Sequence, residues 1–126
     1  MARPAEQFED VIAWQKARQL TRVIYETTKQ SAFARDWGLT GQIQRSAVSI
    51  MANVAEGFER GKPKEYLQFL LVAKASCAEV RSHLYVALDS GYLDEPTFVR
   101  LREQARETSR VISGLRAAIE RHQHLE

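Results

Sequence analysis

The sequence is poor in residues that cross-link a chain or hold a metal. Cys77 is the only cysteine among 126 residues, which excludes an intramolecular disulfide and a fold that depends on an oxidising compartment. The single cysteine and three histidines show no Cys/His spacing typical of a zinc site. We therefore expect neither a metal nor a cofactor.

Long hydrophobic runs are also missing. No stretch approaches the ~20 apolar residues that a membrane-spanning helix needs, and the first ten residues contain acids but no apolar core, unlike a signal peptide. We expect a cytoplasmic protein with no membrane partner. The ending Leu125-Glu126 resembles the remnant of a purification tag.

Charge of one sign is not concentrated anywhere. Lys and Arg number 18 and Asp and Glu number 16, for a net charge of +2, so a surface for nucleic acid would have to be assembled by folding or by oligomerisation. With 44% hydrophobic and 27% charged residues, the composition excludes a disordered chain. The length predicts a single domain over 1–126, with an ordered core at about 8–120.

The few helix breakers divide the chain into four segments. Five of the six glycines and two of the three prolines gather near 38–41, 57–63 and 91–96. The segments, at about 8–31, 39–58, 63–90 and 96–122, each repeat apolar residues at spacings of three and four, which predicts helices. Short connections favour antiparallel neighbours. We predict an all-α fold, an antiparallel up-down-up-down four-helix bundle.

Helix ends are also marked in the sequence. Asp94 is placed to cap the fourth segment. Gly57 or Gly61 can end the second segment and Gly91 the third. Pro63 stands at the start of the third segment, where the first helical turn needs no backbone N–H.

Some segments carry a second apolar stripe. We interpret this excess as a subunit interface, because large exposed apolar patches mark interaction sites. The alternative is a wide core stripe with a few aromatic residues facing solvent. The candidate interface residues are Val11, Trp14, Tyr25, Leu67, Leu71 and Tyr85.

Residues for catalysis are not evident. Cys77 falls on the main apolar stripe and is expected to pack in the core. Glu79 and His83 could share a metal ion, but no third ligand is near in sequence, and an ordinary histidine is the simpler interpretation. No nucleophile motif or phosphate loop is present, so we expect no catalytic residues and no enzyme.

The second segment has one polar face on an otherwise apolar helix. Ser and Asn are poor helix-interior residues unless their side chains find partners. The face could be solvated, could form a buried network that fixes the register of the bundle, or could line a binding groove. Its members are Gln42, Arg45, Ser49, Asn53, Glu56 and Arg60.

Several cations are candidates for phosphate contacts. An arginine stripe on the fourth segment would be repeated around a ring of subunits, and such an array can bind phosphates at a small net charge. The alternative is a solvated face in which Glu103 and Glu107 pair with these arginines. The candidate nucleic-acid contacts are Arg45, Arg60, Lys62, Lys64, Arg102, Arg106 and Arg110.

Several blocks of residues form an ordered set along about 8–115. The most distinctive block is Ala47-Val48-Ser49-Ile50 leading into Asn53-Val54-Ala55-Glu56-Gly57. The other blocks are Phe8 to Ala17, Ile24-Tyr25 with Thr28, Gly38-Leu39 with Gln42-Ile43, Lys64-Glu65-Tyr66, Phe69-Leu70, Ala75-Ser76 with Glu79, and Gly91-Tyr92-Leu93. Together these blocks resemble a known family, the four-helix-bundle proteins encoded in intervening sequences of bacterial 23S ribosomal RNA genes.

The resemblance implies a homopentameric ring of four-helix bundles. It also implies kinship with the accessory protein of diversity-generating retroelements, a basic pentamer that binds nucleic acid and a protein partner, a reverse transcriptase. The resemblance supplies no catalytic residues. This chain departs from the family pattern at Gln44, where a second basic residue is common, at Met51, where proline is frequent, and in the loop 31–37, which lacks the usual Phe-Pro start.

Overall fold

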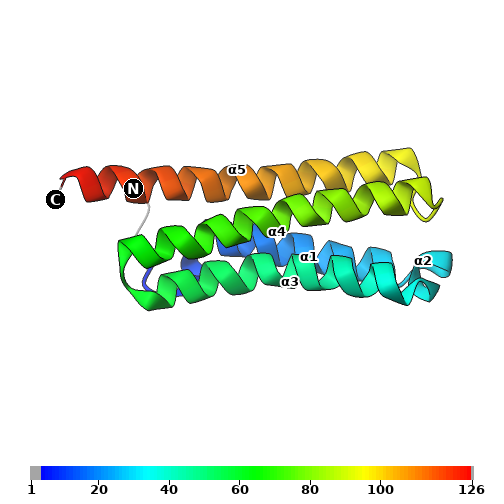
Figure 1. Ribbon diagram of the computed structural model, residues 1–126, viewed down its shortest axis with the longest axis horizontal. Helices are drawn as coiled ribbons and strands as arrows, with labels where there is room; N and C mark the ends of the chain where they lie inside the picture. Colours follow the sequence, from blue (N-terminus) through cyan, green and yellow to red (C-terminus); the bar gives the residue numbers. More distant parts are fainter. Residues whose placement is uncertain (1–3, 126) are drawn as a thin grey trace.

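A computed structural model describes residues 4–125, and four long helices dominate it (Figure 1). They are α1 (Ile12–Thr28), α3 (Trp37–Arg60), α4 (Pro63–Asp89) and α5 (Glu95–Leu125). A short 3-10 helix, η1 (Phe8–Asp10), precedes α1, and the short helix α2 (Ser31–Arg35) joins α1 to α3. Glu126 lies outside the described residues. The all-α fold is confirmed.

Each long helix packs on two of the others. α1 contacts α3 and α5, and α4 contacts α3 and α5, so α1 and α4 stand at opposite corners of the bundle. Consecutive long helices run antiparallel, which gives the predicted up-down-up-down order (Figure 1). A salt bridge of 3.1 Å from Lys16 Nζ to Glu107 Oε1 joins α1 to α5 on the surface.

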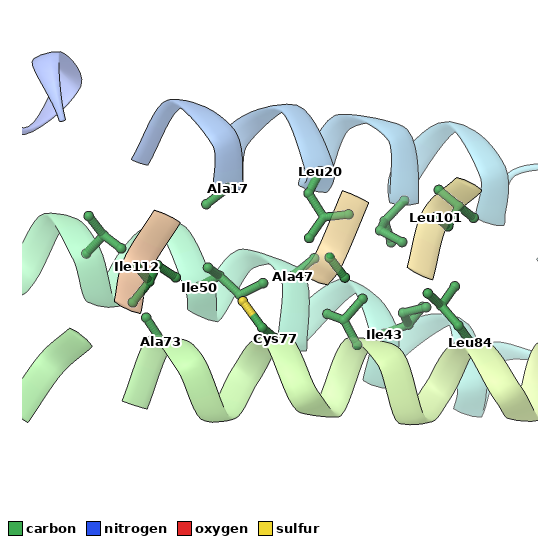
Figure 2. Close-up of a cluster of buried hydrophobic side chains, with 14 of the residues drawn as sticks. Ala17, Leu20, Ile43, Ala47, Ile50, Ala73, Cys77, Leu84, Leu101 and Ile112 are labelled. Atoms are coloured by element: carbon green, nitrogen blue, oxygen red, sulfur yellow. The ribbon is translucent and has the colours of Figure 1, made fainter. Parts of the chain in front are cut away.

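The core is the stripe that the three-and-four spacing predicts. Every long helix contributes fully buried side chains, among them Leu20, Ile50, Leu84 and Leu101 (Figure 2). Alanines at facing positions, including Ala17, Ala47 and Ala73, allow close helix approach. Cys77 lies among them, fully buried, and burial raises the pKa of its thiol to about 11. The prediction that Cys77 packs in the core is confirmed.

The helix ends follow the predicted caps at three places. Asp94 Oδ1 accepts a hydrogen bond of 2.9 Å from the Thr97 amide at the start of α5. Gly61 and Gly91 adopt φ of 73° and 79° after α3 and α4, a conformation that suits glycine. Gly57 does not end α3. It lies within the helix, where a Cβ would stand 2.8 Å from the Phe69 Cβ and 2.9 Å from Tyr66 Cδ1 on α4.

The first segment and the loop after it differ from the prediction. A helix was expected over 8–31, but the chain is extended at Val11, between η1 and α1. Residues 31–37 were expected to be a loop, but α2 forms there because Phe33 buries its ring against Tyr92, with ring centroids 5.3 Å apart. Asp36 then caps α3, accepting a hydrogen bond of 3.0 Å from the Leu39 amide.

Candidate interaction surfaces

The outward surface of α4 is apolar along most of its length. We call the exposed residues of α4 between positions 68 and 86 the outer face of α4; they are Gln68, Leu71, Val72, Ala75, Ala78, Glu79, Ser82, Tyr85 and Val86. Leu71 is 54% exposed, Val72 48% and Val86 47%. Glu79 is the one charged residue on this face. A contiguous apolar strip of this kind marks an interaction site more often than a solvated surface.

Two of the six predicted interface residues lie on the outer face of α4. They are Leu71 and Tyr85, while Leu67 is half-buried on the same helix. Tyr85 also packs edge-to-face on Phe98 of α5, with centroids 4.8 Å apart. The sequence prediction missed Val72 and Val86, which a second helical series through residues 68, 72, 75, 79, 82 and 86 could have found.

The other three predicted interface residues belong to the N-terminal part of the chain. Trp14 is half-buried between the Phe8 ring, 5.2 Å away, and the Arg18 guanidinium, 5.7 Å away. Tyr25 is exposed on α1, at the corner opposite α4. The prediction for Val11 is wrong, because this side chain is only 7% exposed and packs in the core of its own chain. The extended backbone at Val11 takes it out of the helical series to which it was assigned.

The polar face of α3 divides into a half-buried part and an exposed part. Ser49 and Ser76 share a hydrogen bond of 2.9 Å between α3 and α4, and the Asn53 amide donates to the Ser49 backbone oxygen at 2.8 Å and to its hydroxyl at 3.0 Å. This network links the two helices, as the register interpretation expected. Gln42 and Glu56 are exposed instead, and Glu56 binds Arg60 at 3.1 Å.

A polar hollow of about 290 Å³ opens between α3 and α4 beside this network. Gln42, Arg45, Ser46 and Ser49 line it from α3, and Glu79 and His83 from α4. Arg45 lies back along its own helix over Gly41, where a Cβ would stand 3.0 Å from the Arg45 Nη1. Within the described residues, no three His, Cys, Asp or Glu side chains come close enough to hold a metal ion.

Several of the candidate phosphate contacts pair with carboxylates of the same chain. Arg102 and Arg106 lie 3.5 Å and 2.7 Å from Glu103 Oε1, and the hydrogen bond from Arg106 holds the pKa of that carboxyl below its usual range. Arg60 pairs with Glu56 and Glu65 and covers the Phe69 ring at 5.1 Å. The predicted arginine stripe is therefore partly neutralised by its own helix.

The remaining candidate cations are exposed. They are Arg45 on α3, Lys62 and Lys64 at the connection between α3 and α4, and Arg110 on α5. None of the four makes an ion pair within the described part of the chain. They stand at three places along the chain, because Lys62 and Lys64 are only two residues apart.

Comparison with known proteins identifies the family. The family model described as "23S rRNA-intervening sequence protein" matches residues 9–114. The chain belongs to this family. No curated protein matches the sequence.

A solved structure shares the fold of this family member. It is the 1.70 Å crystal structure of a protein of unknown function from the S23 ribosomal protein family of Bacteroides thetaiotaomicron, with a TM-score of 0.78 and 16% sequence identity. The similarity covers 84% of this chain and 96% of the other. At this identity the comparison supports the helical fold alone.

Among residues 4–125, no helix has the length and hydropathy needed to cross a bilayer.

Proposed function

We propose that this family member is a non-enzymatic protein that assembles with itself through the outer face of α4. The observation that carries the proposal is the exposure of Leu71, Val72, Tyr85 and Val86 on a helix whose opposite side already fills the core. Burial of exposed apolar surface is the main driving force for association. A single charged residue, Glu79, interrupts the strip, and its carboxylate would need a polar partner on the second copy or a place at the edge of the contact.

Two exposed apolar residues on other helices suggest how the copies would join. Tyr25 on α1 is 37% exposed and Val48 on the neighbouring α3 is 41% exposed, on a different corner of the bundle from α4. When two different patches of one subunit join, the contact is heterologous, and it closes into a ring if the rotation allows. The family resemblance implies five subunits, and we adopt the pentamer as the expected ring.

The oligomer can be tested by light scattering on a sizing column. We expect the wild-type chain to have a mass well above the 14.4 kDa of one subunit. Val72→Glu should reduce the mass to that of a monomer because it places a charge in the buried strip. Val99→Glu is the matched control, since Val99 is also an exposed valine but belongs to α5 and not to the outer face of α4. A monomeric wild type, or an unchanged mass for Val72→Glu, would contradict the proposal.

A second candidate activity is binding of structured RNA or DNA by the assembled ring. It is supported by the exposed cations Lys64 and Arg110, which have no carboxylate partner in the described chain. A ring would repeat these charges around one assembly, and each phosphate contact releases counterions. The alternative is a ring that binds a protein partner and no nucleic acid.

The two alternatives separate in a gel-shift titration with a structured RNA hairpin. Nucleic-acid binding predicts an affinity that falls steeply between about 50 and 200 mM salt. It also predicts a larger loss for Arg110→Gln than for Arg106→Gln, because Arg106 already pairs with Glu103. If the oligomer does not bind the hairpin at about 50 mM salt, the alternative of a ring that binds a protein partner is favoured.

A further inference from the structure

The end of the bundle where α3 turns into α4 carries a separate groove. α5 continues past that turn (Figure 1), so the inward side of its last turns has no long helix opposite it. A hollow of about 450 Å³ lies there. Phe58 and Lys62 line it from the end of α3 and the connection, Pro63 and Tyr66 from the start of α4, and Ile119 from α5. We call it the terminal groove.

The walls of the terminal groove are mainly apolar. The Phe58 and Tyr66 rings meet edge-to-face with centroids 6.1 Å apart, and Ile119 is only partly covered by its own chain. Phe58 and Tyr66 also line a second hollow of about 510 Å³, together with Val111 and Leu115. The apolar surface therefore continues from the terminal groove along α5. Pockets of this size with mainly hydrophobic walls are the usual form of a small-molecule site.

Three of the side chains that line the terminal groove carry polar groups, namely Lys62, Tyr66 and His122. Lys62 is exposed and makes no ion pair in the described part of the chain. Tyr66 offers a neutral phenol at neutral pH, where its ordinary pKa near 10 already keeps it protonated, and burial raises that pKa further to about 12. Among the described residues that line the hollow there is no Asp or Glu. An apolar slot beside an unpaired ammonium is complementary to a ligand with an apolar body and one negative end.

We propose that the terminal groove binds an aliphatic monocarboxylate of medium chain length. The alkyl chain would lie against Phe58, Tyr66 and Ile119, and the carboxylate would pair with Lys62. This site is distinct from the outer face of α4, and it shares only Lys62 with the candidate phosphate contacts. It does not depend on assembly or on nucleic-acid binding.

Decanoate is the probe for this site, and binding would be followed by calorimetry below its micelle concentration. We expect one decanoate per chain, with affinity reduced about tenfold in Lys62→Met. Lys64→Met is the matched control, because Lys64 is exposed two residues away and does not line the groove. Decanol, which has the same chain and no charge, should bind the wild type about as weakly as decanoate binds Lys62→Met.

A second variant tests the apolar part of the site. Ala118 lines the groove and is exposed, so Ala118→Phe should fill the space and abolish decanoate binding without disturbing the core. Circular dichroism would verify that this variant is folded. Absence of decanoate binding at millimolar concentration, or binding that neither variant weakens, would overturn the proposal. A lower oligomer mass for Ala118→Phe would also overturn it, because the groove would then be a contact between copies.

Discussion

The Tyr92 hydroxyl donates a hydrogen bond of 2.9 Å to Asp36 Oδ2, which joins the turn after α4 to the start of α3. The other oxygen of the same carboxylate caps α3 at the Leu39 amide. Tyr92 also stacks on Phe33 of α2. One carboxylate and one phenol thus hold three elements together at this end of the bundle.

This hydrogen bond makes a pH-dependent prediction. It raises the pKa of Tyr92 above its ordinary value, mainly because the protonated phenol donates to Asp36. A raised pKa in the folded state gives stability that is present below the unfolded pKa near 10 and is lost as pH rises through the folded value. Tyr92→Phe should therefore lower the melting temperature at pH 7, and the difference from wild type should shrink above pH 10. A difference that is constant from pH 7 to 11 would contradict this account.

The close approach of α3 and α4 at Gly57 can be tested by adding one methyl group. A Cβ there would lie 2.8 Å from Phe69 Cβ, so we expect Gly57→Ala to destabilise the protein by about 1–3 kcal/mol, as overpacking does. Gly114→Ala is the matched control, because Gly114 lies within α5 with nothing within 4 Å of its Cβ position. This control should gain about 0.5–1 kcal/mol from helix propensity. Urea unfolding measures the free energy of unfolding of both variants. Equal changes in the two variants would contradict the close packing of α3 on α4 at Gly57.

The buried thiol of Cys77 should not react with alkylating reagents in the folded protein. Its pKa is about 11 because burial disfavours the thiolate, so iodoacetamide at pH 8 should leave it unmodified until urea unfolds the chain. The unfolded thiol ionises near pH 9, so the contribution of Cys77 to stability should be lost as pH rises from about 9 to 11. Rapid alkylation of the native protein at pH 8 would show that the core is more open than described.

The core was predictable because it depends on local periodicity. Leu101, Ala105, Thr108 and Ile112 repeat at spacings of three and four, and all four are buried. The caps at Asp94, Gly61 and Gly91 were predictable for the same reason, since each depends on a few adjacent residues.

Features that depend on distant contacts were not predictable. α2 forms where Phe33 meets Tyr92, which is 59 positions away in the sequence. Val11 joins the core because its backbone is extended and α1 begins only at Ile12. The spacing of apolar residues did not show where α1 begins. The polar hollow needs the register between Arg45 on α3 and His83 on α4, which only the packed helices define.

The most direct test of the central claim is the chemical accessibility of the outer face of α4 in the assembled protein. Ala75→Cys places a thiol at an exposed position of this face, and Ser90→Cys places one at an exposed position beyond the end of α4. Cys77 supplies no background because it is buried. We expect iodoacetamide to label Cys at position 75 at least tenfold more slowly than at position 90 at high protein concentration, because a second copy covers the strip. Equal labelling rates at every concentration would show that the face stays open to solvent and would contradict self-assembly through α4.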